Sequence, residues 1–279
     1  MATRLGARAD RLKGLRALRG PKGRRERHRF LFEGPTLLDE ALRSGVTIEE
    51  LYVTAAAYAS NEAVRALDAA GMPTFLLDER SAAGLSEVES PTGILAVAAV
   101  RRFDGPQLFD RDGLVLVLAD VNDPANAGTL LRSAEAFGAS GVAFGDRGVD
   151  PFHSKVVRAA MGSLFRLRVG RIVPADLGEA GGNGFRIAGL RAAGDDLRRM
   201  AWPARTALVV GSERRGLGRW EQACEQFLGI PMGGPTESLN AAIAGSIALY
   251  EATRNRAETA MREPCQDSVS AQKSQDYRG

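Results

Sequence analysis

Three separated stretches of the chain gather glycines and polar side chains of the kind that hold a small ligand. They are Asp120–Arg132, Gly211–Gly218 and Ile230–Asn240, and each follows a short apolar run. Glycine and proline end regular structure there, and the free N–H groups of a following helix can bind a polar or anionic group. An ordinary strand-to-helix turn would explain any one stretch. Three of them together are the stronger signal of a binding site.

Within these stretches a few side chains could take part in chemistry. Asn126 and Arg132 stand six residues apart in the first, and Glu213 lies between glycines in the second. Ser238 stands in the third where a helix start favours a side-chain oxygen. Arg132 needs a partner if it is buried, and otherwise extends to solvent. The second stretch lacks the Gly-Lys-Ser/Thr of a P-loop and the Gly-x-Gly-x-x-Gly of a dinucleotide site, so those two nucleotide sites are not expected.

The elements around these stretches predict a mainly parallel α/β sheet, whose strands would bring the three loops to one edge. Strands are expected at 114–119, 141–144, 164–169, 185–190, 207–210 and 227–230, and helices at 126–137, 155–161 and 220–226, with a helix of small residues from 240 to 250.

The first hundred residues alternate strands and helices in the same way and predict a small α/β domain. Strands are expected at 30–32, 48–53, 73–77 and 94–100, and helices at 34–43 and 61–70. The predicted organisation is a basic N-terminal extension (1–22, with an amphipathic helix at 5–18), a front domain (23–100), a linker (101–113), a second domain (114–256) and a disordered tail (257–279).

Composition narrows the functional classes. The chain has 279 residues, of which 44% are hydrophobic and 25% charged, and no apolar run reaches the roughly 18 residues of a membrane span, so we expect a cytoplasmic protein without a membrane partner. Two cysteines and two histidines favour neither a disulfide framework nor a metal site. Eleven lysines and arginines against two acids lie between Arg4 and Arg29. This density predicts a polyanion partner, with a solvated basic leader as the alternative.

Taken in order, the three stretches resemble a known family. Asn126-x-Gly128-x-x-x-Arg132, Gly211-x-Glu213-x-x-Gly216-Leu217, and Ile230-Pro231-Met232 with Ser238-Leu239-Asn240 are similar to the motifs of the SpoU/TrmH class of SPOUT RNA methyltransferases. The segment Ser154–Leu167 resembles that class around a second arginine, Arg158. The stretches RRERHRFLFEGPTLLDEAL and SPTGILAV resemble the L30e-like substrate-binding domain found in front of many members. The resemblance runs from about Arg24 to Arg254.

The resemblance implies a fold and an activity. The expected fold is α/β, with a trefoil-knotted parallel-sheet SPOUT domain behind a small L30e-like domain. The expected activity is S-adenosyl-L-methionine-dependent methylation of a ribose 2′-hydroxyl in structured RNA by a homodimer, without a metal. Ribosomal RNA of the 23S type is favoured over tRNA. A tRNA 2′-O-methyltransferase, a non-catalytic RNA-binding protein and a small-molecule α/β enzyme remain as alternatives.

The resemblance also implies residue roles. Catalytic positions would be Arg132, Asn126, Glu213, Ser238 and Asn240; cofactor-binding positions would be Gly211, Ile230, Met232, Ser238, Leu239 and Asn240; RNA-binding candidates are Arg24, Arg25, Arg27, Arg29 and Arg158. Arg132 is expected to bind the adjacent phosphate and stabilise developing alkoxide, because a guanidinium is effectively always protonated and makes a poor base. Arg158 would contact RNA phosphate or serve as a structural arginine.

Overall fold

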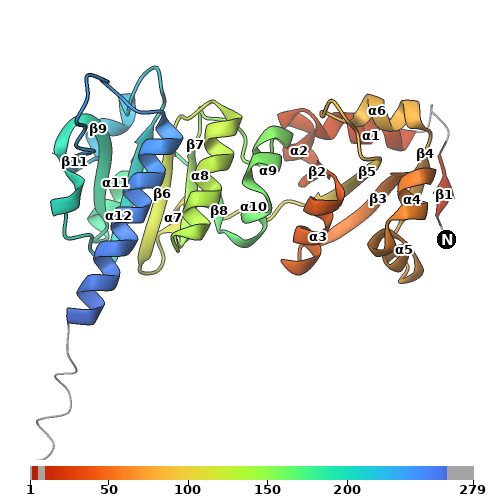
Figure 1. Ribbon diagram of the computed structural model, residues 1–279, viewed down its shortest axis with the longest axis horizontal. Helices are drawn as coiled ribbons and strands as arrows, with labels where there is room; N and C mark the ends of the chain where they lie inside the picture. The colour runs from red at the N-terminus through yellow and green to blue at the C-terminus, as the bar shows by residue number, and fades with distance from the viewer. Residues whose placement is uncertain (1, 6–9, 263–279) are drawn as a thin grey trace, which may run out of the picture.

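The computed structural model describes residues 2–5 and 10–262, which form two α/β domains joined end to end (Figure 1). The front domain is built on strands β1–β5 and the second domain on strands β6–β11. The predicted α/β class holds for both domains, because each alternates helices with strands around one central sheet.

The front domain has a mixed five-stranded sheet in the order β1-β4-β3-β5-β2, with β1, β4 and β3 parallel and β5 antiparallel to β3 and β2. Helix α1 packs on one face through the buried Leu12, Leu15 and Leu18, so the domain begins earlier than the predicted residue 23. The elements are β1 (Thr3–Arg4), α1 (Asp10–Leu18), α2 (Pro21–Arg27), β2 (Arg29–Glu33), α3 (Pro35–Arg43), β3 (Ile48–Thr54), α4 (Ala55–Ser60), α5 (Glu62–Ala69), β4 (Thr74–Leu77), α6 (Glu79–Leu85) and β5 (Ile94–Ala99).

The second domain has a six-stranded, entirely parallel sheet in the order β11-β9-β10-β6-β7-β8. Its elements are α7 (Gly105–Leu108), β6 (Gly113–Ala119), α8 (Pro124–Ala136), β7 (Gly141–Gly145), α9 (Ser154–Ala160), α10 (Ser163–Arg166), β8 (Val169–Ile172), α11 (Pro174–Gly182), β9 (Arg186–Asp196), the 3₁₀ turn η1 (Leu197–Arg199), β10 (Arg205–Gly211), the 3₁₀ turn η2 (Gly218–Ala223), β11 (Gln226–Gly229) and α12 (Ala241–Arg262).

Strand β6 shows why this sheet is covered on both faces. Leu114, Leu116 and Leu118 belong to one core with α8, α9 and α12, while the alternate residues Val115 and Val117 belong to a second core with α7, α11 and η2. A strand that is apolar on both faces is typical of a parallel sheet between helical layers. The sheet therefore lies in the middle of three layers, and its loops carry the polar side chains.

Three local expectations are wrong. The predicted linker belongs to the second domain, because Phe103 forms a bridge with Gly170 and α7 follows it. The segment expected to be a strand at 164–169 is largely helix α10, and the strand β8 begins at Val169. Helix α12 begins at Ala241, one residue after the predicted start, and its cap is Asn240 rather than Ser238.

The last helix also continues past the predicted start of the tail, to Arg262. The rest of the predicted tail, 263–279, lies outside the described residues. The trefoil knot stays a prediction from the resemblance. Among the described residues, no helix is long and apolar enough to cross a membrane.

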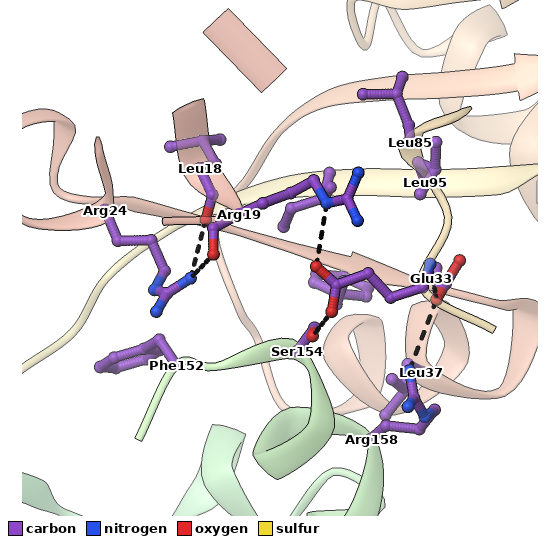
Figure 2. Close-up of a pocket in the computed structure, with 13 residues that line it drawn as sticks. Leu18, Arg19, Arg24, Glu33, Leu37, Leu85, Leu95, Phe152, Ser154 and Arg158 are labelled. Atoms are coloured by element: carbon purple, nitrogen blue, oxygen red, sulfur yellow. Dashed lines mark hydrogen bonds and ion pairs between the residues drawn. The ribbon is translucent and has the colours of Figure 1, made fainter. Parts of the chain in front are cut away.

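The two domains share one hydrophobic core across the seam between them. Phe30 of β2 lies 5.0 Å from Phe152 between ring centroids, and Phe32 lies 5.5 Å from Phe165. Arg24 is only 2% exposed at this seam, and its Nε donates to Asp150 of the second domain at 2.9 Å. Figure 2 shows its other contacts, to the carbonyl groups of Leu18 and Arg19. The seam is therefore a packed interior.

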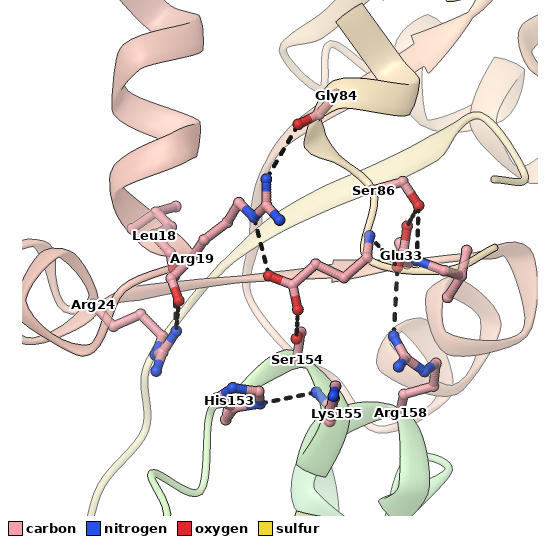
Figure 3. A network of polar contacts seen from close by, with 12 residues as sticks. Leu18, Arg19, Arg24, Glu33, Gly84, Ser86, His153, Ser154, Lys155 and Arg158 are labelled. Carbon is pink, nitrogen blue, oxygen red and sulfur yellow. Dashed lines mark hydrogen bonds and ion pairs between the residues drawn. The ribbon is translucent and has the colours of Figure 1, made fainter.

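Polar pairs close the edge of the seam (Figure 3). Glu87 of the front domain accepts hydrogen bonds from Arg19, at 3.0 Å, and from the Ser154 hydroxyl at the start of α9. Arg158 of α9 faces Glu33 of β2 at 3.6 Å. Since each contact joins groups of opposite charge or a donor with an acceptor, the pairs fix how α9 sits against the front domain.

Candidate active site

The polar stretches meet at the carboxyl edge of the parallel sheet, where the second and third of them line a cavity of about 360 Å³. We call it the inner cavity. Seven of the residues expected at a cofactor or catalytic site line it: Gly211, Glu213, Ile230, Met232, Ser238, Leu239 and Asn240. Its volume lies within the range of small-molecule sites. The inner cavity thus lies at the carboxyl edge of the sheet, where the sequence predicted a binding site.

Sequence reasoning missed one wall of the inner cavity. Leu190, Arg191 and Ala192 of β9 line it as well. Strand β9 lies between β10 and β11 in the sheet, so its residues share the edge with the loops that follow those strands. The strand itself was predicted from its apolar run, but the sequence does not reveal its place in the strand order.

Close backbone packing shapes the floor of the inner cavity. A Cβ on Gly211 would lie 2.2 Å from the carbonyl carbon of Gly216, so only glycine fits there. The Ser212 N–H donates to the Gly216 carbonyl at 3.0 Å, and the Gly216 N–H donates back to Ser212 at 2.8 Å. These contacts tie off residues 212–216 as a tight loop at the end of β10. The loop presents Glu213 at a fixed place.

Three side chains, one from each stretch, meet at the boundary of the inner cavity. The Asn240 amide donates to the Asn126 carbonyl oxygen at 3.1 Å, and the Asn126 amide donates to a Glu213 carboxylate oxygen. We call Asn126, Glu213 and Asn240 the polar junction.

Helix caps set the positions of both asparagines. Asp123 accepts from the N–H of Asn126 at the start of α8, at 3.0 Å. Asn240 accepts from the N–H groups of Ala242 and Ile243 at the start of α12, at 2.8 and 3.2 Å. Asn240 therefore has the capping role that was expected of Ser238.

A second hollow, the outer cleft, of about 860 Å³, adjoins the inner cavity. Ser212, Glu213, Gly216 and Asn240 line both hollows, whereas Asn126 lines the outer cleft and not the inner cavity. The polar junction consequently stands between two spaces. The inner cavity is enclosed by the ends of β9, β10 and β11 and by the start of α12, and the outer cleft is reached from the loops after β6 and β10.

Arg132 is not part of this arrangement within one chain. It is exposed on α8 and lines neither hollow. Ala125, Thr129 and Ala136 are exposed on the same face of α8. Beside it, α12 exposes Ile243 (53%), Ile247 (38%) and Tyr250 (54%). Ser133 and Ser246 join the two helices by a hydrogen bond of 2.6 Å.

The arginines expected to bind RNA occupy different environments. Arg25 and Arg27 are exposed on α2, whereas Arg29 pairs with Glu49 at 2.5 Å and Arg158 faces Glu33. Arg24 corrects the expectation, because its guanidinium is buried and donates to Asp150 and to the carbonyls of Leu18 and Arg19. A side chain whose donors point into the seam is not available to RNA.

The inner cavity fits S-adenosyl-L-methionine chemically. Apolar side chains, including Val210, Leu228 and Ile230, can cover an adenine ring, and backbone groups near the close-packed Gly211 can bind its polar edges. Glu213 supplies a carboxylate at the boundary, which suits a cationic sulfonium. Among the described residues, no group of three or more His, Cys, Asp or Glu side chains could hold a metal ion.

The fold and this edge define a methyltransferase domain behind a substrate-binding domain, and comparison with known proteins agrees. The SpoU rRNA Methylase family matches residues 113–250, and the MRM3-like substrate binding domain matches residues 9–96. An uncharacterised tRNA/rRNA methyltransferase of Synechocystis is 32% identical over 88% of this chain and 91% of its own. The 23S rRNA (guanosine(2553)-2′-O)-methyltransferase RlmP of Bacillus subtilis is 29% identical over 88% and 96%.

Solved structures give the same answer. The SpoU methyltransferase AviRb from Streptomyces viridochromogenes, in complex with AdoMet, superposes with a TM-score of 0.81 at 28% identity, over 90% of this chain and 99% of its own. An AdoMet-bound rRNA methyltransferase from Sinorhizobium meliloti has a TM-score of 0.79 at 29% identity, over 91% and 98%. This chain belongs to the SpoU methylase family. The expected family, α/β fold class and cofactor are confirmed.

Proposed function

We propose that the chain transfers a methyl group from S-adenosyl-L-methionine to a ribose 2′-hydroxyl of ribosomal RNA. The observation that carries this proposal is the polar junction, where one residue from each of the three stretches meets between the inner cavity and the outer cleft. A transfer enzyme needs a donor space and an acceptor space that meet at one point. Relatives named as 23S rRNA 2′-O-methyltransferases support the RNA and the position of methylation.

The chain's own residues divide the work of the reaction. When bound, S-adenosyl-L-methionine supplies the methyl group. The inner cavity holds and orients this donor through Gly211, Ile230, Met232 and Leu239, with Ser238 at its wall. The polar junction holds the boundary at which the ribose hydroxyl must approach, and its hydrogen bonds leave little freedom for that boundary to move.

Arg132 binds the phosphate next to the target ribose and stabilises the oxygen as its proton leaves. Since Arg132 lines neither hollow of its own chain, we infer that it acts on the site of a second copy. The exposed Ile243, Ile247 and Tyr250 lie on the helix packed against α8, so one apolar face beside Arg132 is available for that copy. The functional unit we propose is therefore a homodimer joined through α8 and α12.

Methyl transfer with tritiated S-adenosyl-L-methionine and an unmodified 23S rRNA transcript tests the activity. Arg132→Ala is expected to lower turnover by roughly 10² or more, because an electrostatic stabiliser is lost, while calorimetry shows unchanged donor binding. Thr129→Ala, on the same exposed face, is the matched control. If the wild-type protein binds the donor but transfers no methyl group to RNA, the proposed activity is wrong and the chain is better explained as a non-catalytic RNA-binding protein.

Mixing two inactive variants tests the homodimer. Arg132→Ala keeps the inner cavity, and Glu213→Ala keeps Arg132, so a mixed dimer contains one complete site only if Arg132 reaches the partner's cavity. We expect activity to return after the two are unfolded and refolded together. Continued inactivity in dimers shown to be mixed would place Arg132 on its own chain's site.

RNA binding outside the site is assigned to exposed basic side chains of the front domain and of helix α9 beside it. Arg25 and Arg27 have no hydrogen bond or ion pair with other described residues, and Arg29 and Arg158 present guanidinium groups that are only partly covered. We favour ribosomal RNA over tRNA because the matched family and several relatives carry that substrate in their names. We place the reaction in the cytoplasm, where this RNA is available.

A further inference from the structure

The outer cleft carries three arginines to which no role is assigned above. Arg147, Arg214 and Arg215 line it, and we call them the rim arginines. Arg147 follows β7, whereas Arg214 and Arg215 stand at the tip of the loop after β10. All three side chains are exposed, and none forms a hydrogen bond or ion pair with another described residue. Unpaired guanidinium groups from two loops thus converge on one hollow.

Arginines outnumber carboxylates among the side chains that line the outer cleft: Arg147, Arg214, Arg215 and Arg219 face Asp120, Asp123 and Glu213. Asp120 accepts from Arg219 at 2.9 and 3.1 Å, which accounts for the fourth arginine of the cleft. Asp123 caps α8, and Glu213 accepts from Asn126. The lining therefore carries a net positive charge, with the guanidinium groups of the rim arginines unpaired among the described residues. A cleft of this kind attracts an anion.

Both loops that carry the rim arginines are held in place. The base of the 212–216 loop is closed by its two backbone hydrogen bonds and by the packing of Gly211 against Gly216. The 145–149 loop is held by Arg171, whose half-buried guanidinium donates to the carbonyls of Gly145 (3.0 Å), Asp146 (2.9 Å), Gly148 (3.2 Å) and Val149 (3.1 Å). Anchored loops can present charge at defined positions.

We propose that the outer cleft is the acceptor-strand site, in which the rim arginines bind the RNA phosphates that flank the target nucleotide. This inference rests on the proposed function and names where its RNA lies. A planar guanidinium fork matches a phosphate, and phosphate contacts fix register without reading sequence. Because Ser212, Glu213 and Gly216 line both hollows, a strand bound by Arg214 and Arg215 lies next to the donor. The rim arginines set the acceptor's position, and the polar junction separates it from the donor.

The test compares two double variants with one control in the transfer assay. Arg214→Ala/Arg215→Ala is expected to raise the KM for the unmodified 23S rRNA transcript roughly tenfold or more, because charge-assisted contacts are lost. Donor affinity by calorimetry should stay within about twofold. Arg214→Lys/Arg215→Lys keeps the charge and should recover most of the affinity. Arg199→Ala removes an exposed arginine of the same domain that lines neither hollow, and should leave the KM unchanged.

The salt dependence of RNA binding gives a readout that a structural role would not move. When log affinity is plotted against log salt concentration, each phosphate contact to a single strand contributes roughly 0.7 to the negative slope. The slope of the double alanine variant should therefore be shallower than that of wild type by about 1.4. Arg147→Ala should remove about 0.7. An unchanged KM and slope, or a loss of donor binding, would overturn the assignment. If wild-type protein transfers no methyl group, the proposed function fails, whereas an active wild type with unaltered rim variants refutes only this inference.

Discussion

The seam between the domains and the outer cleft use the same residue type in opposite ways. At the seam, Arg24 and Arg166 are held by carboxylates from distant parts of the chain, with Asp150 at 2.9 Å from one and Glu40 at 2.6 Å from the other. At the outer cleft, the rim arginines have no partner among the described residues. An arginine whose donors are occupied fixes structure, and one whose donors are unoccupied is available to a ligand. The partners, and not the residue type, decide which role an arginine has.

The largest effect should come from the buried member of the seam. Arg24→Ala removes a guanidinium that is 2% exposed from Asp150, whose side chain is 10% exposed. Asp150 keeps the N–H of Phe152 at 3.1 Å and the more distant guanidinium of Arg102 at 3.7 Å. We expect the free energy of unfolding to fall by about 3–5 kcal/mol, as for other broken buried pairs. Urea denaturation measures it, with the exposed neighbour Arg25→Ala as control. A fall in the free energy of unfolding of less than about 1 kcal/mol would mean that Arg24 does not hold the seam together.

A smaller and pH-dependent effect is expected at the partly exposed end of the seam. Arg166 donates to Glu135 and Glu40, and its hydrogen bond lowers the pKa of Glu135 below the ordinary 4.5. Since the folded state favours ionised Glu135, the stabilisation is complete above the ordinary pKa and is lost as the pH falls through the lowered one.

Arg166→Ala should therefore cost about 1 kcal/mol at pH 7, because solvent screens the pair, and progressively less as the pH is lowered past 4.5. Thermal melts over this pH range measure the difference from wild type. Arg43→Ala removes the far more exposed contact to Glu40 and serves as control. A pH-independent difference would mean that Arg166 acts through packing alone.

The smallest effect on stability should come from the rim arginines. Arg214→Ala/Arg215→Ala breaks no hydrogen bond or ion pair with a described residue, so we expect the free energy of unfolding to change by less than about 0.5 kcal/mol. Together with a raised KM for RNA, this would complete the contrast with Arg24→Ala. A destabilisation of 1 kcal/mol or more, measured by urea denaturation, would show that these arginines hold the loop.

Local pattern was enough to predict most of the sheet and the place of the site. The apolar runs at β6, β7, β10 and β11 predicted parallel strands, and their polar ends predicted the edge where the inner cavity lies. Asn126, Glu213 and Asn240 were expected around the transfer because their motifs resemble the family's, and the structure joins them by hydrogen bonds.

What the sequence could not supply were contacts between distant residues. Arg24 was assigned to RNA from a run of basic residues, but its partner Asp150 lies 126 positions away. Ser238 and Asn240 are equally good helix caps by residue type, so the start of α12 depended on which side chain could also reach Asn126. Arg132 lies in the expected helix, yet one chain alone does not bring it to either hollow.

The aromatic contact of Phe30 and Phe32 with Phe152 and Phe165 makes the two domains a single mechanical body. In our proposal, RNA bound by the exposed arginines of α2 would therefore lie at a fixed distance from the edge that carries the inner cavity. On this proposal, the distance between the two contact points on a folded RNA would help to select the target nucleotide.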